Sequence, residues 1–344
     1  KDITQIKNLL ISSCEKKLNS DQPIALMLSS GTDSSLLASI YKKELNINLE
    51  SFHASFENLK NSNSEVNETD LTKKIAIALD LNLTIKKIDI DEKFFSNKNL
   101  FELFNEPNDN ISTLLLYSIN RSISEKYKVA ISGLGADEIF YGYNGYSFFN
   151  KNIKFIQSNF LNKTLKYFDK IKFGKLKTLK YYNKYSGLDL IFSHFNFDYY
   201  EDIENKYHDN LEYNNKLSFI ENYSLIRFSS TLPYQMLSAS DKASMHTSLE
   251  VRSPYLNKEL LQKVLEFDPN TLINYGHKYL QKKILEDYLP KNLINQKKIG
   301  FILNTKTFIE NSFSEIVKRK DKSFEFNRLN LRKLMYKDFF YNEN

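Results

Sequence analysis

A loop rich in serine follows a short apolar run near the start of the chain, with the sequence SSGTDSS at residues 29–35. The apolar run at 24–28 is typical of a buried strand, and residues 34–44 favour a helix. A loop between a strand and a helix N-terminus offers backbone N–H groups and a positive dipole to anions. Gly31 allows a ligand to approach the chain closely. Hydroxyl donors come from Ser29, Ser30, Ser34 and Ser35. We interpret the loop as a phosphate site.

Asp33 in the middle of this loop needs a separate explanation, because a carboxylate repels phosphate. The loop lacks the GxxxxGK[ST] pattern, so it is not a Walker A loop. A Mg²⁺ ion held by one or two carboxylates and by phosphate oxygens would turn the repulsion into a bridge. The alternative is that Asp33 only caps the following helix.

A second loop of the same kind lies about a hundred residues later, in KVAISGLGADEIFYGY at 128–143. An apolar strand again runs into a Ser-Gly pair, and Asp137 and Glu138 follow. In a parallel sheet both loops would lie at the carboxyl ends of strands, where ligands bind. Asp33 and Asp137 are therefore expected to share one metal ion over one pyrophosphate. The alternative is a glycine-rich turn with solvent-exposed acids.

The elements that would position these loops alternate along the first part of the chain. The predicted helices cover residues 3–18, 34–44, 67–80 and 111–126. The predicted strands cover residues 24–28, 49–56, 83–90 and 128–132. Alternation of this kind predicts an α/β fold with a doubly wound parallel sheet, covered by helices on both faces.

The pattern changes after about residue 140, where segments become long, mostly helical and rich in Phe, Tyr, Asn and Lys. The 344 residues fit about two domains. We predict an α/β domain at 1–145 and a mostly helical acceptor-side region at 146–344. Aromatic residues in 141–230 are expected to form packing core instead of a ligand site. Arg252 is expected to form a buried ion pair with Glu250 that shapes the helical region.

The composition limits the classes of partner that we expect for this chain. The net charge is +6 without any basic block, which suits small anionic substrates better than nucleic acid. The single cysteine, Cys14, falls within a helical pattern, so disulfides and a cysteine-based metal site are excluded. A reducing, cytoplasmic compartment is expected. No apolar run approaches the roughly 18 residues of a membrane span, and no signal peptide is visible.

Several motifs together resemble a known family. The first loop resembles the pyrophosphate loop of the N-type ATP pyrophosphatases, and the second resembles the SGEGADELFGGY segment of the asparagine synthetase family. Further stretches agree in order; they are NETDLTKKIA (67–76), SDKASMHTSLEVRSPYLN (240–257) and LPKNLINQKKIGF (289–301). The resemblance runs from about residue 3 to residue 310. It implies a synthetase domain with the adenine nucleotide alpha hydrolase-like, PP-loop fold.

The resemblance implies a role for each matching position. Backbone groups of Leu28 and Ala54 would flank the adenosine of ATP. The pyrophosphate would lie against residues 29–35. Ser132 and Gly133 would line the nucleotide.

The same resemblance implies the catalytic groups. Asp33 and Asp137 would bind Mg²⁺, and Lys298 would neutralise charge on the phosphate or the developing transition state. On the substrate side it places Glu138, Asp241 and Leu134. The implied chemistry joins a small-molecule carboxylate to ATP as an acyl-adenylate, from which ammonia or an amine then displaces AMP.

Leu134 departs from the family pattern. It stands where the family has a loop Glu that is implicated in forming the acyl-adenylate, and leucine can neither accept nor donate a proton. Relatives that close β-lactam rings also lack this Glu, although they have a Tyr there. We interpret the chain as a user of ATP with an altered acceptor. A nucleotide-binding relative without catalytic activity is the alternative.

The source of nitrogen stays open. The family's glutaminase half needs an N-terminal cysteine nucleophile, and Cys14 is internal. Nitrogen would come from free ammonia, a separate glutaminase, an amine within the substrate, or a missing N-terminal glutaminase domain. A tRNA-modifying enzyme with the same loop is a further alternative. The lack of paired cysteines and of a basic patch interleaved with aromatic residues argues against it.

Overall fold

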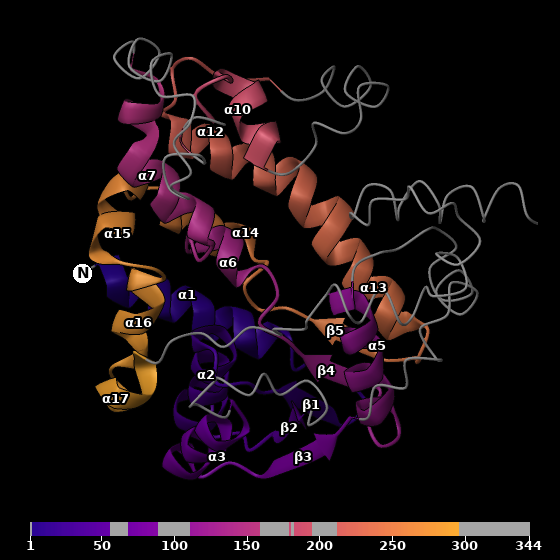
Figure 1. Cartoon of the computed structure of the whole chain (residues 1–344). Coiled ribbons are helices and arrows are strands. Elements are labelled where there is room, and N and C mark those ends of the chain that lie inside the picture. Colours follow the sequence, from indigo (N-terminus) through magenta and orange to yellow (C-terminus); the bar gives the residue numbers. More distant parts are fainter. Residues whose placement is uncertain are drawn as a thin grey trace, which may run out of the picture. The chain divides into compact units, whose positions relative to one another are not determined.

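A computed structural model describes residues 2–55, 68–88, 111–158, 179, 182–194 and 212–295 (Figure 1). The chain divides into two compact units. The sheet unit contains the described residues among Lys1–Leu134, Met236–Leu260 and Gln281–Asn344. The helical unit contains those among Gly135–Gln235 and Leu261–Leu280. The chain thus leaves the sheet unit first after Leu134, and the boundary at 145 stays a prediction.

One parallel sheet organises the sheet unit, and it confirms the predicted fold class. Its strands are β1 (Ile24–Met27), β2 (Glu50–Ser55), β3 (Leu83–Lys87), β4 (Val129–Ile131) and β5 (Glu250–Arg252). Their order is β3-β2-β1-β4-β5, and all neighbours are parallel. In register, Leu26 of β1 lies between Ser51 of β2 and Ile131 of β4. The strand order therefore reverses between β1 and β4, which is where ligands bind in such sheets.

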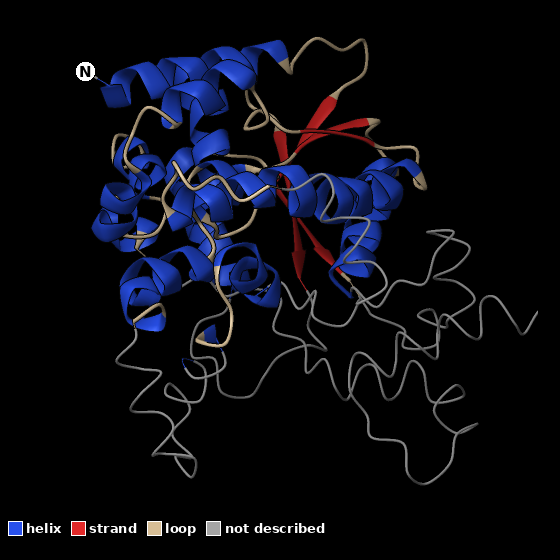
Figure 2. Cartoon of the chain, turned by 90° about the horizontal axis from the view of Figure 1, so that it is seen from above, coloured by secondary structure: helices blue, strands red, loops and turns tan. Residues whose placement is uncertain are grey.

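Helices cover both faces of the sheet (Figures 1 and 2). They are α1 (Asp2–Lys16), α2 (Thr32–Ser39) with its π-helical continuation η1 (Ile40–Glu44), α3 (Glu68–Leu79), α5 (Ile111–Ser124) and α13 (Ser238–Met245). Figure 1 shows α2 and α3 on one side and α5 and α13 on the other, as right-handed connections require. Ile123 of α5 joins Ala25, Phe52 and Ala130 of the strands in one buried cluster.

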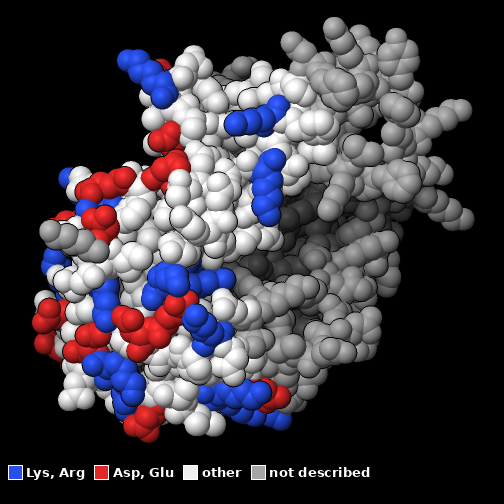
Figure 3. Space-filling model, turned by 90° about the vertical axis from the view of Figure 1, so that its left-hand side faces the viewer, with Lys and Arg blue, Asp and Glu red and all other residues white. Residues whose placement is uncertain are grey.

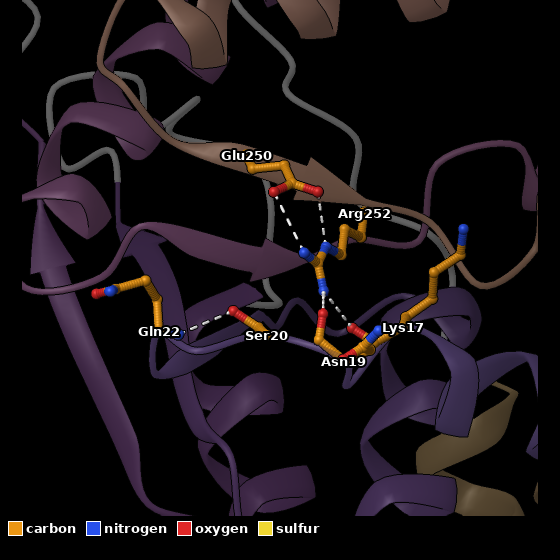
Figure 4. Close-up of polar contacts among 6 residues, drawn as sticks. All are labelled: Lys17, Asn19, Ser20, Gln22, Glu250 and Arg252. Carbon is orange, nitrogen blue, oxygen red and sulfur yellow. Dashed lines mark hydrogen bonds and ion pairs between the residues drawn. The ribbon is translucent and has the colours of Figure 1, made fainter.

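Strand β5 was not predicted, because a three-residue strand with one apolar residue, Val251, carries no periodic signal. The Glu250–Arg252 pair forms, with 2.7 Å between Arg252 Nε and Glu250 Oε1. Arg252 also donates to the carbonyl oxygens of Lys17 and Asn19, as Figure 4 shows. The expectation of a buried pair shaping the helical region was wrong. The Glu250 side chain is 57% exposed, and Arg252 fixes the sheet edge to the chain after α1.

The helical unit contains α6 (Ala136–Ile139), α7 (Asn144–Ile156), α10 (Gly187–His194), α12 (Phe219–Ile226) and α15 (Pro269–Tyr275). Four further helices join or extend the units; they are η4 (Arg227–Leu237), α14 (Lys258–Val264), α16 (Tyr279–Leu285) and α17 (Lys291–Ile294). Within the described residues, no helix combines the length and the apolar character that a membrane crossing requires.

Aromatic rings form the core of the helical unit, which confirms the packing role expected for them. Tyr146 is buried with its ring centroid 4.9 Å from that of Tyr223, and Phe149 lies 5.0 Å from Phe219. Tyr141 packs edge-on against Tyr146 at 5.3 Å. The edge-to-face pairs of Tyr146 with Tyr223 and with Tyr141 contribute about 0.5–1.5 kcal/mol each beyond the burial of their area.

Candidate active site

The Ser-Gly loop connects β1 directly to α2, and its own hydroxyls fix its shape. Ser29 N–H donates to Ser34 Oγ at 3.0 Å, and Gly31 N–H donates to Ser29 Oγ at 3.2 Å. Ser35 Oγ donates back to the Gly31 carbonyl at 2.9 Å. The buried hydroxyls of Ser34 and Ser35 therefore shape the loop from within. The N–H groups of the first turn of α2 are the ones oriented toward an anion.

The loop after β4 lies against the loop after β1. A Cβ atom added to Gly133 would lie 2.9 Å from Asp33 Cβ, so any side chain there would displace Asp33. Ser132 N–H donates to the Arg252 carbonyl at 2.9 Å, which extends the pairing of β4 with β5 to the start of this loop. The two predicted loops thus meet at the switch point of the sheet.

The Asp33 side chain is oriented by a residue from far along the chain. Gln281 Nε2 donates to Asp33 Oδ1 at 3.1 Å, and Gln281 is 0% exposed. Tyr255 donates its phenolic hydrogen to the Asp33 backbone carbonyl at 2.8 Å. The helix cap position belongs to Gly31, where no side chain makes a cap hydrogen bond. The alternative that Asp33 is only a cap is therefore wrong.

The oxygen atoms around Asp33 fit a hard divalent cation. Gln281 Oε1 is buried and has no hydrogen-bond donor among the described residues. Mg²⁺ prefers carboxylate oxygens and keeps several waters, and such a water would supply the missing donor. Within the described residues no three His, Cys, Asp or Glu side chains cluster to hold a metal. A site with one or two carboxylates needs no such cluster.

A histidine supports the strand end at which adenosine is expected. Leu28 N–H donates to the Phe52 carbonyl at 2.8 Å. His53 Nδ1 lies 3.2 Å from the Leu28 carbonyl oxygen, and its Nε2 lies 3.1 Å from Thr69 Oγ1. Burial lowers the pKa of His53 from its ordinary value of 6.5, so its ring is neutral at neutral pH. Ala54, the other predicted adenosine contact, follows His53 in β2 and is half-buried.

Asp137 forms a tight ion pair inside the helical unit. Lys278 Nζ lies 2.6 Å from Asp137 Oδ1, and the Lys278 side chain is 7% exposed. Lys278 adopts a left-handed backbone with φ +56°, which costs a non-glycine residue about 1–3 kcal/mol. A Cβ atom on Gly142 would lie 2.0 Å from Asp137 Oδ1 and 2.3 Å from Lys278 Cε. A side chain at position 142 would therefore displace the ends of both side chains of this pair.

Glu138 is buried, so the alternative of a turn with solvent-exposed acids was wrong for this residue. It is 2% exposed and accepts a hydrogen bond from the Tyr143 hydroxyl at 2.7 Å. The Arg227 guanidinium lies over the Tyr143 ring, 3.7 Å from its centroid. Burial raises the pKa of Glu138, while the Tyr143 hydrogen bond and the Arg227 charge oppose the rise.

The predicted residues fall into separate groups. Asp33 belongs to the sheet unit and Asp137 to the helical unit, so their common cation stays a prediction. Lys298 lies outside the described residues. Leu134 and Asp241 line one cavity of the sheet unit.

Sequence reasoning missed Lys278 and Gln281. Lys278 is one of 48 Lys and Arg residues and stands in no motif that we interpreted. Gln281 is a single polar residue in a helical segment. Its contact with Asp33 spans 248 positions, which no local pattern reveals.

A doubly wound parallel sheet with a Ser-Gly loop and a carboxylate at its switch point defines a nucleotide-binding α/β protein. The family model for asparagine synthase matches residues 5–342. The chain belongs to the asparagine synthase family, whose members use ATP.

The known proteins that match this chain have low sequence identity to it. The asparagine synthetase (glutamine-hydrolyzing) 1 of Bacillus subtilis is 25% identical over 92% of this chain and 52% of its own length. A probable asparagine synthetase (glutamine-hydrolyzing) of Acanthamoeba polyphaga mimivirus is 29% identical over 29% of the chain and 21% of its own length. A Mycobacterium bovis relative is 23% identical over 86% of the chain and 47% of its own length. The chain thus spans about half the length of the first of these relatives.

Proposed function

We propose that the chain is an ATP-dependent, AMP-forming ligase that makes an amide bond from a small-molecule carboxylate. The observation that carries the proposal is the Asp33 carboxylate. It is oriented by the buried Gln281 amide at 3.1 Å, and it lies in the first Ser-Gly loop against Gly133 of the second. Family membership supports the use of ATP.

The reaction has two steps. A carboxylate oxygen of the substrate attacks the α-phosphorus of ATP, the bond to the β-phosphate oxygen breaks, and pyrophosphate leaves with that electron pair. A nitrogen nucleophile then attacks the acyl carbon of the acyl-adenylate, AMP leaves, and the nitrogen loses a proton to solvent. Adenylation is needed because a carboxylate by itself is a poor electrophile.

We assign a role in this reaction to particular residues of the chain. Asp33, with Asp137 as its predicted partner, would hold Mg²⁺, which when bound neutralises phosphate charge and orients the leaving pyrophosphate. The first turn of α2 would bind phosphate oxygens through backbone N–H groups. Lys278 supplies a buried positive charge beside Asp137, suited to a phosphate or adenylate. Lys298 stays a predicted charge-neutralising group.

The proposal also includes the source of nitrogen and the cellular compartment. Ammonia, a separate glutaminase, an amine within the substrate, or a glutaminase domain outside this sequence would each supply nitrogen. Cytoplasmic ATP and Mg²⁺ would support the reaction. Leu134 favours one second candidate, a nucleotide-binding protein without ligase activity, because the loop lacks a proton-transferring group.

The test is exchange of labelled pyrophosphate into ATP with Mg²⁺ and a panel of carboxylic acids. We expect exchange that depends on the acid and is lost in Asp33→Asn. Asp21→Asn, an exposed residue of the same unit, is the matched control and should exchange normally. ATP binding without exchange for any acid would favour the second candidate and overturn the ligase proposal.

A further inference from the structure

A cavity of about 380 Å³ opens in the sheet unit, between the end of β4 and one face of α13. Leu134, Leu237 and Val251 line its apolar side, and Ser240, Asp241 and Ser244 contribute polar groups. Cavities of roughly 300–1,000 Å³ hold small molecules in proteins. The volume is therefore sufficient for a small organic acid.

The cavity begins one residue from the proposed nucleotide site. Leu134 directly follows Gly133, and Gly133 is the residue whose added Cβ would lie 2.9 Å from Asp33. A molecule in the cavity would therefore lie beside the loop that is proposed to bind ATP. This is the place where a second substrate is needed.

The walls of the cavity are fixed by the protein. Leu134 N–H donates to Ser132 Oγ at 3.2 Å, and the Leu134 carbonyl accepts the hydroxyl hydrogen of Ser253. Ser244 is 1% exposed and donates to the Asp241 carbonyl at 3.1 Å. These bonds hold the backbone at Leu134 and Asp241, and so fix the points from which the two side chains extend into the cavity lining.

The side chains that line the cavity favour one kind of carboxylic acid as a ligand over another. The three apolar side chains would cover a hydrocarbon group, and the Asp241 carboxylate would accept hydrogen bonds from an ammonium group. No Lys, Arg or His is among the described residues that line the cavity. Against these described residues, a second carboxylate on the ligand would meet the like charge of the exposed Asp241 side chain, which is unfavourable.

We propose that this cavity binds the acceptor as an amine-bearing monocarboxylic acid with an apolar side chain, and that it rejects dicarboxylic acids such as aspartate. Leu134 is the specificity residue, and Asp241 recognises the amine. The inference rests on the proposed ligase function. It adds the class of acid that is adenylated.

The experiment compares acids in the pyrophosphate exchange assay. Leucine and phenylalanine represent the proposed class, aspartate and glutamate the rejected one, and 4-methylpentanoate is leucine without its amine. We expect kcat/KM for leucine to exceed that for aspartate by about tenfold or more, the discrimination that a fixed pocket achieves. We also expect 4-methylpentanoate to be weaker than leucine.

Variants separate recognition from folding. Asp241→Asn should raise KM for leucine but not for 4-methylpentanoate, because only leucine has the amine that Asp241 binds. Leu134→Glu should raise KM for leucine while KM for ATP stays unchanged. Glu259→Gln, whose carboxylate is 61% exposed in its pair with Lys16, is the control. Circular dichroism confirms that each variant is folded.

The outcomes distinguish the two proposals. Exchange with aspartate equal to or better than exchange with leucine keeps the ligase function and overturns this inference. An equal rise in KM for leucine and 4-methylpentanoate in Asp241→Asn also overturns it. No exchange with any acid overturns both.

Discussion

Gln281 and Asp33 are joined by a hydrogen bond of 3.1 Å between the Gln281 amide nitrogen and the Asp33 carboxylate, although 248 positions separate them. The bond fixes the direction of the Asp33 side chain without adding a positive charge next to it. A carboxylate oriented by a neutral amide stays negatively charged and suited to a cation. Gln281 is thus expected to act as a positioning residue for Asp33.

Replacement of Gln281 by leucine tests this role. Leucine is similar in volume and leaves no unsatisfied amide, so the free energy of unfolding should change by only about 1 kcal/mol. Asp33 should lose its orientation, and the Mg²⁺ concentration needed for ATP binding should rise. Titration of ATP binding with Mg²⁺ measures this shift. Gln22→Leu, at an exposed position of the same unit, is the control. An unchanged Mg²⁺ requirement would show that Gln281 is only a packing residue.

Gly142 is predicted to be irreplaceable because of the ion pair beside it. In Gly142→Ala the new Cβ would overlap Asp137 Oδ1 and Lys278 Cε, so both side chains must shift and their ion pair is disturbed. Overpacking of this kind costs about 1–3 kcal/mol, measurable by urea unfolding. Pyrophosphate exchange should fall at the same time.

The comparison for Gly142 is Gly276→Ala. Gly276 has φ +119°, but nothing lies within 4 Å of its added Cβ. This variant reports the backbone strain alone, and its exchange activity should exceed that of Gly142→Ala at equal stability. Equal losses of activity in the two variants would contradict a role for the Asp137–Lys278 pair.

The Glu50 carboxylate is predicted to make the free energy of unfolding depend on pH in the acid range. Hydrogen bonds from Lys126 and Tyr127 lower the pKa of Glu50 to about 2, below its ordinary value of 4.5. A lowered pKa contributes stability above pH 4.5 that is lost as the pH falls toward 2. Glu50→Gln should therefore flatten this part of the profile, as thermal unfolding between these pH values would show. Glu125→Gln, whose carboxylate is 65% exposed in its pair with Lys86, is the matched control for removal of a surface carboxylate. A profile in Glu50→Gln as steep as that of the unchanged chain would contradict the prediction.

The charged side chains of the drawn face agree with the lack of a basic block in the sequence. Figure 3 shows acidic and basic side chains next to one another over the face that it draws. Ion pairs such as Lys7–Glu44 and Lys42–Asp80, each at 3.0 Å, have this local arrangement. Charges paired locally on this face indicate no single charged partner for it.

Much of the fold was predictable because local patterns determine it. The strands β1 to β4 and helices α1 to α5 that are described lie within a few residues of their predicted ranges, since apolar runs and turn residues define them. Strand β5 escaped prediction because its pairing with β4 is set by tertiary contacts. The Ser-Gly loops were predictable from their motifs, whereas Lys278 and Gln281 required contacts across long stretches of chain.

The final prediction uses the buried imidazole of His53, which is 4% exposed. Burial lowers its pKa below 6.5, so in mild acid the unfolded chain takes up a proton that the folded chain refuses. The contribution is present above pH 6.5 and is lost as the pH falls toward the folded pKa. The free energy of unfolding should decline there by at most about 1.4 kcal/mol per pH unit.

His53→Asn should reduce this decline, because asparagine does not titrate in this range, and thermal unfolding between neutral pH and pH 5 measures the difference. Thr69→Val is the matched control, since it removes the 3.1 Å contact at Nε2 but keeps the imidazole. It should retain the pH dependence of the unchanged chain. If His53→Asn and the unchanged chain lose stability in parallel, the folded protein protonates the His53 ring as readily as the unfolded chain does. Our interpretation that a neutral His53 ring contacts the Leu28 carbonyl would then be wrong.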